Sequence, residues 1–464
     1  GCEYLTNVIT KLFSIYVPQR INKQKNVYPV WFNTDIVRAI IQRKYHWKMY
    51  KKYKVLSHKE RARQLNQRIR SAAREEYQNF LNSAEEKIRN DPSQLWSFVN
   101  EKNKSSRIPG VMSHGEKKLA NPQDIVNNFA ILFSSVFKQY NSGNSSVSSN
   151  QCDNKKCDTK CDCDNICDNN LNVSVLHNFV INEKDISKCV RKIKANFTMG
   201  ADSIPAFFIR DCISCLITPL QQLYNLILKT EVFPESWKIA RVCPIFKSGS
   251  KFETTNYRPV AIIPNFAKLF QIILFDNVYS HILQQLTDHQ HGFVRGKSTC
   301  TNLCNFTQFV SDSLNCTQQV DTVYMDLSKA FDVVNHPILL KKLHNFGLCD
   351  SLVNLFKSIL SGQKQYVEYS GYRSPVYECH SGVCQGSNLG PLLFIIYIND
   401  VVKSLNFDCR IFLYADDIKL AKIIDNLQDC EKLQKVLDAI IRWCQIHKLD
   451  ININKCHITG KLML

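Results

Sequence analysis

Two adjacent carboxylates, Asp416 and Asp417, lie between two apolar runs within residues 411–420. The lengths of these runs predict a β-hairpin whose turn carries both acids, although the turn lacks the usual Asn-Gly or Asp-Gly pair. Neighbouring carboxylates repel each other. A divalent cation such as Mg²⁺, which proteins often hold through one or two carboxylates, would relieve that repulsion. A solvated acidic turn is the alternative, and a third carboxylate is needed to choose between the two.

That third carboxylate is predicted to be Asp326, which ends a β-branched and aromatic run over residues 320–326. A carboxylate at a strand's end, beside a hairpin with two more, could hold two metal ions roughly 3.5–4 Å apart, an arrangement that supports in-line displacement at phosphorus. Residues 326–336 (DLSKAFDVVNH) and 414–417 (YADD) closely resemble the A and C motifs of reverse transcriptases, in the form found in non-LTR (LINE-type) retrotransposons of the jockey/CR1 kind.

The composition of the 464-residue chain fits a globular protein of two or three domains, and its net charge of +18 indicates a polyanionic partner. No apolar run approaches the roughly 18 residues of a membrane span. Most of the 20 cysteines stand singly and no signal pattern opens the chain. We therefore expect an intracellular protein, nuclear or cytoplasmic, with reduced thiols and no membrane partner. We also expect a fragment of a longer coding sequence.

A basic helical region is expected over residues 1–140. Within it, residues 38–74 contain thirteen Lys or Arg and one acid, Glu60, for a net charge of +12. This one-sided charge favours contact with a nucleic-acid backbone over an ordinary solvated helix face. Aromatic residues interleaved with the charges could stack on bases: Tyr45, Trp47, Tyr50 and Tyr53.

Residues 141–172 are a low-complexity tract rich in Cys, Asn and Ser, whose cysteine spacing matches no paired zinc motif. We expect a disordered linker there, and opportunistic binding of a soft metal by its cysteines is the alternative. Residues 173–464 are expected to form one continuous α/β domain.

Two cations in that domain are candidates for contact with a triphosphate. Residues 237–247 predict a strand that ends at Lys247, and residues 256–262 carry Arg258. Arg offers a bidentate fork and Lys a point charge. Two surface cations on a sheet are the alternative. The resemblance implies that both are finger residues that clamp the incoming nucleotide.

Three further residues follow from the resemblance. Phe331 stands where the family has a steric gate, a ring that rejects the 2′-hydroxyl of a ribonucleotide by clash. A plain core ring is the alternative. Residues 381–394 resemble the B motif, in which Gln385 would lie along the nucleotide or template base and Gly386 would permit close backbone approach. Asp332 is expected to orient local structure rather than bind metal.

Residues 448–455 resemble the D motif, whose Lys455 could protonate the pyrophosphate leaving group. A solvated lysine is the alternative. Tyr414, next to the acid pair, is expected at the bound nucleotide. Residues 289–303, a Gly-rich stretch with hydroxyls, could lie along template phosphates.

The resemblance covers roughly residues 193–459. It implies an α/β (α+β) right-hand polymerase, with fingers and an antiparallel palm sheet, after the basic helical region. Asp326, Asp416 and Asp417 would surround two Mg²⁺ ions, or Mn²⁺ in their place. The implied enzyme is an RNA-directed DNA polymerase, a nucleotidyltransferase that extends a DNA primer on an RNA template from dNTPs, within a ribonucleoprotein. We expect the chain to lack the endonuclease and thumb of such proteins.

Two other functions remain open. An RNA-dependent RNA polymerase is disfavoured by Phe331 and by the Tyr-Ala-Asp-Asp sequence. A non-catalytic nucleic-acid-binding remnant is disfavoured by the intact acids.

Overall fold

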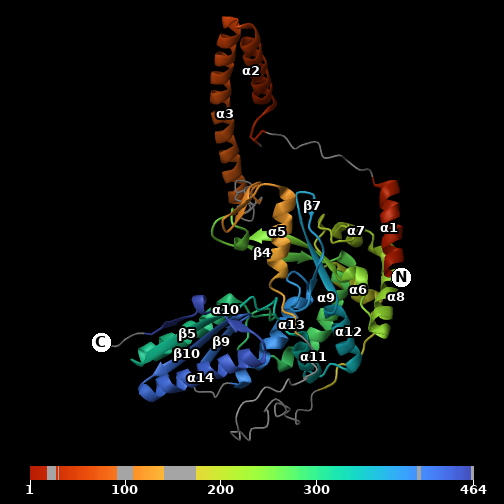
Figure 1. The fold of residues 1–464 in the computed structure, drawn as a ribbon, viewed down its shortest axis with the longest axis vertical. Coiled ribbons are helices and arrows are strands. Elements are labelled where there is room, and N and C mark those ends of the chain that lie inside the picture. The colour runs from red at the N-terminus through yellow and green to blue at the C-terminus, as the bar shows by residue number, and fades with distance from the viewer. Residues whose placement is uncertain (18–27, 30, 91–107, 141–173, 405–408, 461–464) are drawn as a thin grey trace, which may run out of the picture. The chain divides into compact units, whose positions relative to one another are not determined.

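The computed structural model describes residues 1–464 apart from 18–27, 30, 91–107, 141–173, 405–408 and 461–464. The linker predicted over 141–172 thus lies outside the described residues. The chain forms two compact units, residues 1–10 with 109–464, and residues 11–108 (Figure 1). Within the described residues, every helix falls short of the length or hydrophobicity that a bilayer crossing requires.

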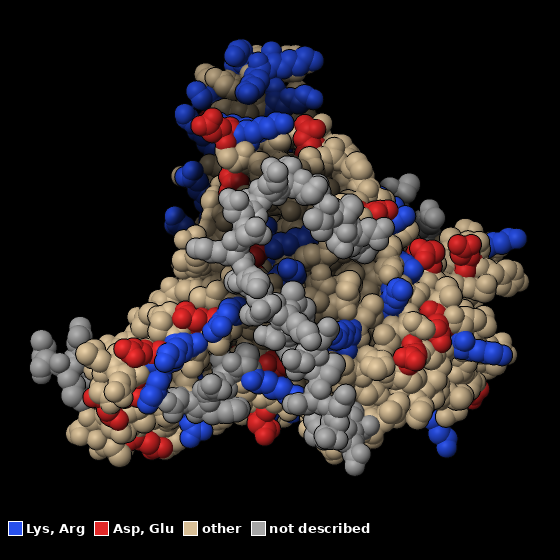
Figure 2. Space-filling view, turned by 60° about the horizontal axis from the view of Figure 1, so that its bottom comes forward, with Lys and Arg blue, Asp and Glu red and all other residues tan. Residues whose placement is uncertain are grey.

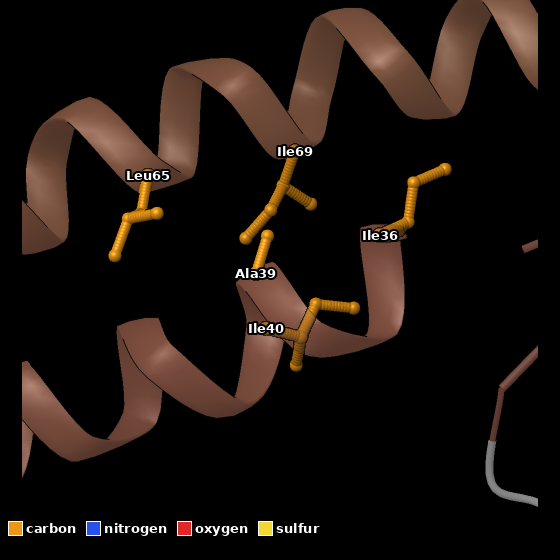
Figure 3. Packing of buried hydrophobic residues seen from close by; sticks show 5 residues of the cluster. All are labelled: Ile36, Ala39, Ile40, Leu65 and Ile69. Atoms are coloured by element: carbon orange, nitrogen blue, oxygen red, sulfur yellow. The ribbon is translucent and has the colours of Figure 1, made fainter. Parts of the chain in front are cut away.

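The unit of residues 11–108 is an antiparallel helical hairpin of α2 (Thr34–Tyr53) and α3 (Leu56–Asn90). Asn33 caps α2 by accepting a hydrogen bond from the backbone N–H of Ile36, and Lys54 ends it in the left-handed conformation. The apolar stripes of the two helices face each other, as Figure 3 shows. The buried contact consists of Ile36, Ala39 and Ile40 on α2 with Leu65 and Ile69 on α3.

The larger unit contains two sheets. The first has the order β4-β3-β6-β7, with β8 beside β6. Its strands β3 and β4 form an antiparallel hairpin, whereas β3 and β6 are parallel. The strands are β3 (Ile239–Phe246), β4 (Tyr257–Ile262), β6 (Gln363–Tyr369), β7 (Tyr372–Arg373) and β8 (Tyr377–Cys379).

The second sheet carries the three candidate acids and is antiparallel throughout, as predicted. Its order is β11-β5-β10-β9, with β12 also beside β5. Its strands are β5 (Gln319–Ser328), β9 (Arg410–Tyr414), β10 (Asp417–Ile424), β11 (Asp450–Ile451) and β12 (His457–Thr459).

Helices cover both faces of this second sheet. Lys419 lies 3.9 Å from the ring centre of Phe306 on α10 (Thr299–Asn315). Lys422, three positions along β10, pairs with Asp429 of α14 (Leu427–Ile446) at 3.8 Å. Since side chains alternate along a strand, α10 and α14 lie on opposite faces.

The remaining helices connect and surround the sheets (Figure 1). They are α1 (Cys2–Tyr16), α5 (Pro122–Ser134), α6 (Glu183–Val190), α7 (Ala206–Asp211), α8 (Ile213–Thr230), α9 (Asn265–Ile282), α11 (His336–Asn345), α12 (Asp350–Leu360) and α13 (Leu389–Ile398). A small hairpin of β1 (Met112–His114) and β2 (Lys117–Leu119) precedes α5.

Residues 109–140 differ from the sequence-based division, which grouped them with the basic region. They belong to the same compact unit as the two sheets. Buried residues of α5 explain the difference, because Phe129 packs edge-on against Tyr257 of β4 at 5.3 Å. Gln123 also donates a hydrogen bond to the carbonyl of Arg373 at 2.8 Å. These contacts join segments about 130 to 250 residues apart, beyond what local pattern predicts.

Candidate active site

The three acids predicted to act together meet at one end of the second sheet. Asp326 of β5 is directly paired with Asp417 of β10, and Asp417 is paired with Tyr414 of β9. The predicted hairpin is thus confirmed, with Ala415 and Asp416 as its two turn residues. Directly paired residues of antiparallel strands present their side chains on the same face. Asp326 and Asp417 therefore share a face, with Asp416 in the adjoining turn.

The electrostatics of these acids reflect burial and mutual repulsion. Burial raises the pKa of Asp416, and the charges of Asp417 and Asp326 raise it further. Burial also raises the pKa of Asp417, with a further contribution from Asp326. Each anionic form is therefore disfavoured in the folded chain until a positive charge arrives.

Lys455 supplies one such charge. Its Nζ lies 2.7 Å from Oδ2 of Asp326, and the same oxygen accepts a hydrogen bond from Asn452 Nδ2 at 3.0 Å. The hydrogen bond to Asp326 raises the pKa of Lys455 and keeps its ammonium protonated. Asp326 is thus held by an ammonium and an amide.

The donor set suits a hard divalent cation, because it consists of carboxylate oxygens whose repulsion such an ion would relieve. Among the described residues, however, no three His, Cys, Asp or Glu side chains are already gathered at the spacing of a metal site. The residues present therefore fit a cation by their chemistry, while Lys455 neutralises part of their charge.

An open cavity of about 640 Å³ lies in front of the acids. Besides the acids and Lys455, its walls include four predicted nucleotide-binding residues, Lys247, Arg258, Phe331 and Gln385. Lys247 and Arg258 come from the adjoining ends of β3 and β4. Neither has a carboxylate partner within the described part of the chain, so both charges are available to an anionic ligand.

The Phe331 ring is fixed by two other rings. It stacks on Phe394 of α13 at 4.3 Å between ring centres, and Phe293 meets it edge-on at 5.9 Å. Because the ring also lines the cavity, it combines packing with exposure to a ligand. This arrangement suits a rigid steric barrier.

The loop that carries Phe331 is joined to residues 381–385. The backbone N–H of Val383 donates to the carbonyl of Phe331 at 2.7 Å, and Gln385 Nε2 donates to Oδ1 of Asp332 at 2.8 Å. Burial raises the pKa of Asp332 to about 6. Since the amide nitrogen of Gln385 is held by Asp332, its carbonyl oxygen is the group left for a ligand.

Two predicted site residues do not line this cavity. Tyr414 is at the end of β9, opposite Asp417, outside the lining. Gly386 lines a separate cavity. It has φ +112°, and a Cβ there would lie 2.4 Å from the carbonyl oxygen of Ala261. Gly386 is therefore required by the backbone, whatever ligand it meets.

The sequence did not predict that residues 289–292 support the acidic turn. Oε1 of buried Gln290 accepts hydrogen bonds from the backbone N–H groups of Ala415 at 3.0 Å and Gly292 at 2.7 Å. A Cβ on Gly292 would lie 2.3 Å from the nitrogen of Ala415. The Gln-x-Gly sequence at residues 290–292 was the only signal of this contact. Residues 289–303 were expected to form a loop along the template, but residues 289–292 contact the hairpin of the acids instead.

Antiparallel strands thus bring three acids to a cavity that lysine and arginine side chains also line. This geometry is typical of polymerases that transfer nucleotidyl groups. Residues 245–462 match the family model described as "Reverse transcriptase (RNA-dependent DNA polymerase)". Over this range, just under half of the chain, the sequence matches a reverse transcriptase domain and is similar to the enzymes of non-LTR retrotransposons. That family, as its name states, copies RNA into DNA, and it generally uses divalent metal ions.

Curated relatives carry the same description. The RNA-directed DNA polymerase from mobile element jockey of Drosophila funebris is 29% identical over 283 residues, which are 59% of this chain and 31% of that protein. The probable RNA-directed DNA polymerase from transposon BS of Drosophila melanogaster is 27% identical over 60% of this chain and 32% of that protein. The matched part thus spans about a third of the length of these relatives.

Among solved structures, the chain is similar to apo telomerase from Candida tropicalis truncated from its C-terminal domain. The TM-score is 0.34 at 14% identity, with 53% of this chain and 56% of that chain covered. The predicted fold class, mixed helix and strand with an antiparallel sheet that carries the acids, agrees with the observed architecture.

Proposed function

We propose that this chain is the polymerase part of a non-LTR retrotransposon protein and adds deoxynucleotides to a primer 3′-hydroxyl on an RNA template. The observation that carries the proposal is the direct pairing of Asp326 with Asp417, with Asp416 in the adjoining turn. This pairing places three carboxylates at one edge of a cavity that also holds two unpaired cations.

The divalent ions would be held by three acids: Asp326, Asp416 and Asp417. When bound, a pair of Mg²⁺ or Mn²⁺ ions would lower the pKa of the primer hydroxyl and neutralise the triphosphate. The chain's own residues supply the positioning, which provides much of the acceleration in phosphoryl transfer.

The position of the other residues in the cavity wall supports a role for each of them. Lys247 and Arg258 bind the triphosphate oxygens, Arg258 through its fork and Lys247 as a point charge. Phe331 excludes a 2′-hydroxyl at the sugar. Gln385, held by Asp332, offers its carbonyl oxygen to the nucleotide or template base.

Lys455 has two roles in this proposal. Before substrate binds, it neutralises Asp326. Once the triphosphate occupies the cavity, its protonated Nζ is a proton donor for the pyrophosphate oxygen. Tyr414 then supports the hairpin beside the acids. As an element-encoded polymerase, the protein would work inside the cell in a ribonucleoprotein with its template RNA.

Primer extension tests the proposal. The chain should incorporate dNTPs on an RNA template–DNA primer in Mg²⁺, and rNTPs far less well. Preferential incorporation of rNTPs would instead support an RNA polymerase.

Nucleic-acid binding without synthesis is the second candidate, and the basic hairpin of α2 and α3 favours it. Lys and Arg gather over its end, as Figure 2 shows. The aromatic rings of Tyr45, Trp47 and Tyr53 are exposed there. A chain that binds template–primer tightly but incorporates nothing would support this candidate.

A further inference from the structure

The loop that carries Phe331 has little regular structure of its own. Residues 329–335 form neither helix nor strand between β5 and α11. Lys329 has φ +49°, a left-handed conformation that is unfavourable for a residue with a side chain. Within the loop, Asp332 donates its backbone N–H to the carbonyl of Lys329 at 2.8 Å. The position of the loop therefore depends on contacts from other segments of the chain.

Four consecutive carbonyls of this loop accept hydrogen bonds from distant segments. The carbonyls of residues 331 and 334 accept from the backbone N–H groups of residues 383 and 382, at 2.7 and 2.8 Å. The carbonyl of residue 332 accepts from the hydroxyl of Ser381 at 2.8 Å. The fourth carbonyl, that of buried Val333, accepts from the hydroxyl of Tyr140 at 2.9 Å, across 193 positions of the sequence. Tyr140 thus supplies one of the four bonds that hold these carbonyls.

Tyr140 belongs to a short segment that follows α5, residues 135–140, which we call the α5 extension. Lys138 makes two further contacts from this segment. Its backbone N–H donates to the hydroxyl of Ser381 at 2.9 Å, and that hydroxyl in turn donates to the loop. Its Nζ pairs with Asp450 of β11 at 2.6 Å, and Asp450 is paired in the sheet with Ser328, the last residue of β5. The α5 extension is thus connected to the start of the loop through β11 and to its end through Tyr140.

The α5 extension lies beside the catalytic cavity. Val136 and Phe137 line that cavity, and the ring centres of Phe137 and Tyr377 of β8 are 6.4 Å apart. Burial raises the pKa of Tyr140, and the charge of Asp450 raises it further. The phenol therefore stays protonated at neutral pH and remains a hydrogen-bond donor.

We propose that Tyr140 is a positioning residue for nucleotide selection, and that its hydroxyl holds the loop so that the Phe331 ring stays at the sugar. The inference rests on the proposed function, because selection against a 2′-hydroxyl is the role given there to Phe331. A steric barrier selects only while it keeps its place, and functional groups must be held to within about 0.5 Å. Without the bond to Val333 the loop gains freedom, and the ring yields to a ribonucleotide more easily.

Tyr140→Phe tests this inference, because it removes the hydroxyl and keeps the ring. The ratio of kcat/KM for matched rNTPs to that for dNTPs, on an RNA template–DNA primer, should rise roughly 2- to 10-fold, the range that one hydrogen bond of ordinary strength supplies. The value of kcat/KM for dNTPs should change less than this ratio, since a deoxyribose does not meet the barrier.

The matched control is Tyr224→Phe. The hydroxyl of Tyr224 also donates to a backbone carbonyl at 2.9 Å, that of Phe266, but this fully buried side chain is not part of the cavity wall. The control should lose stability and keep the parent's ratio of rNTP to dNTP incorporation. An equal rise of the ratio in both variants would mean that general loosening is responsible, and would overturn the inference.

A double-mutant cycle shows whether Tyr140 acts through the ring. In a Phe331→Ala background no ring remains to be positioned, so Tyr140→Phe should leave the ratio of rNTP to dNTP incorporation unchanged. A rise as large as in the parent background would contradict the proposal, as would an unchanged ratio in Tyr140→Phe alone.

Hydrogen exchange of the same proteins tests the positioning without any synthesis. Backbone amides of residues 329–335 should exchange faster in Tyr140→Phe than in the parent or in Tyr224→Phe, while β6 exchanges at the parent's rate. Unchanged exchange in the loop would overturn the inference. A chain whose loop exchanges faster in Tyr140→Phe, but which incorporates neither dNTPs nor rNTPs, contradicts the proposed function and leaves the positioning by Tyr140 supported.

Discussion

The side-chain oxygen of Gln290 lies 3.0 Å from the backbone nitrogen of Ala415 and accepts its hydrogen bond. Ala415 has φ +54°, a left-handed conformation that costs a residue with a side chain about 1–2 kcal/mol. The two-residue turn that carries Asp416 is therefore strained, and a residue some 125 positions earlier in the chain holds it.

Replacing Gln290 with Met should loosen this turn. The substitution keeps the side chain's length but removes the acceptor, leaving two buried N–H groups unpaired at about 1–3 kcal/mol each. Polymerisation rate should fall more than template–primer affinity. Gln271→Met is the control, since Gln271 is equally buried but its Oε1 has no hydrogen-bond partner in the described structure.

Ala415→Gly should make the polymerisation rate less dependent on Gln290, because glycine adopts positive φ without strain. In a double-mutant cycle of catalytic rates, the loss caused by Gln290→Met should be smaller in the Ala415→Gly background. Equal losses in both backgrounds would show that Gln290 does not act through the turn.

Phe331→Ala should admit ribonucleotides. Removing a ring that clashes with a 2′-hydroxyl should raise the ratio of kcat/KM for rNTPs to that for dNTPs by about 10- to 200-fold. Steady-state incorporation of matched nucleotides measures the ratio. Phe306→Ala is the control: it removes a ring that packs on Phe412 outside the cavity, and it should leave the ratio of rNTP to dNTP incorporation unchanged. An unaltered ratio in Phe331→Ala would exclude the gate.

Lys455→Gln should separate turnover from metal binding. The ammonium pairs with Asp326, so its removal leaves the acids with more net negative charge and no competing cation. Mn²⁺ affinity, followed by electron paramagnetic resonance, should not weaken, while kcat should fall because the proton donor is lost. A parallel loss of both would mean that Lys455 only maintains the local structure.

Asp332→Asn should stabilise the chain at neutral pH. The pKa of Asp332 is raised by burial to about 6, from about 4 in an unfolded chain. The folded state therefore binds more protons, and the free energy of unfolding falls as pH rises through this window. Thermal unfolding should show the variant's advantage at pH 7 and little of it at pH 4. Asparagine keeps the oxygen that accepts from Gln385, so the loop should remain intact.

Asp416→Asn should raise thermal stability in the presence of EDTA for a related reason. The pKa of Asp416 is raised mainly by burial, then by the charges of Asp417 and Asp326, so its anion destabilises the metal-free fold above the unfolded pKa. The difference from the parent should shrink at acid pH, where the aspartate is protonated. It should also shrink in Mn²⁺. A variant less stable than the parent in EDTA would contradict this electrostatic account.

The elements that carry the acids were predictable because each is encoded locally. Runs rich in apolar residues define β9, β10 and the end of β5, and the acids stand at the ends of these runs. The direct pairing of Asp326 with Asp417 could be expected only through the resemblance, because register across 91 residues is not encoded by either strand alone.

Contacts between distant segments could not be read in this way. The bond from Ala415 to Gln290, the pairing of Lys455 with Asp326 and the packing of Phe129 on Tyr257 depend on how the chain closes in space. The same holds for Gly386. A side chain at this position would clash with the carbonyl oxygen of Ala261, and the residue lines a cavity separate from that of the acids. The sequence pattern singled out some of these residues, but it could not predict which distant residues they contact.

RNA-templated primer extension by the parent chain and by Asp416→Asn tests the central claim most directly. With Mg²⁺, dNTPs and an RNA template–DNA primer, the parent should extend the primer, and the variant should bind it equally well but extend it at least about 10²-fold more slowly, as expected when charge stabilisation at the reacting phosphate is lost. Equal extension by the two proteins, or tight binding by the parent without any incorporation, would contradict the account.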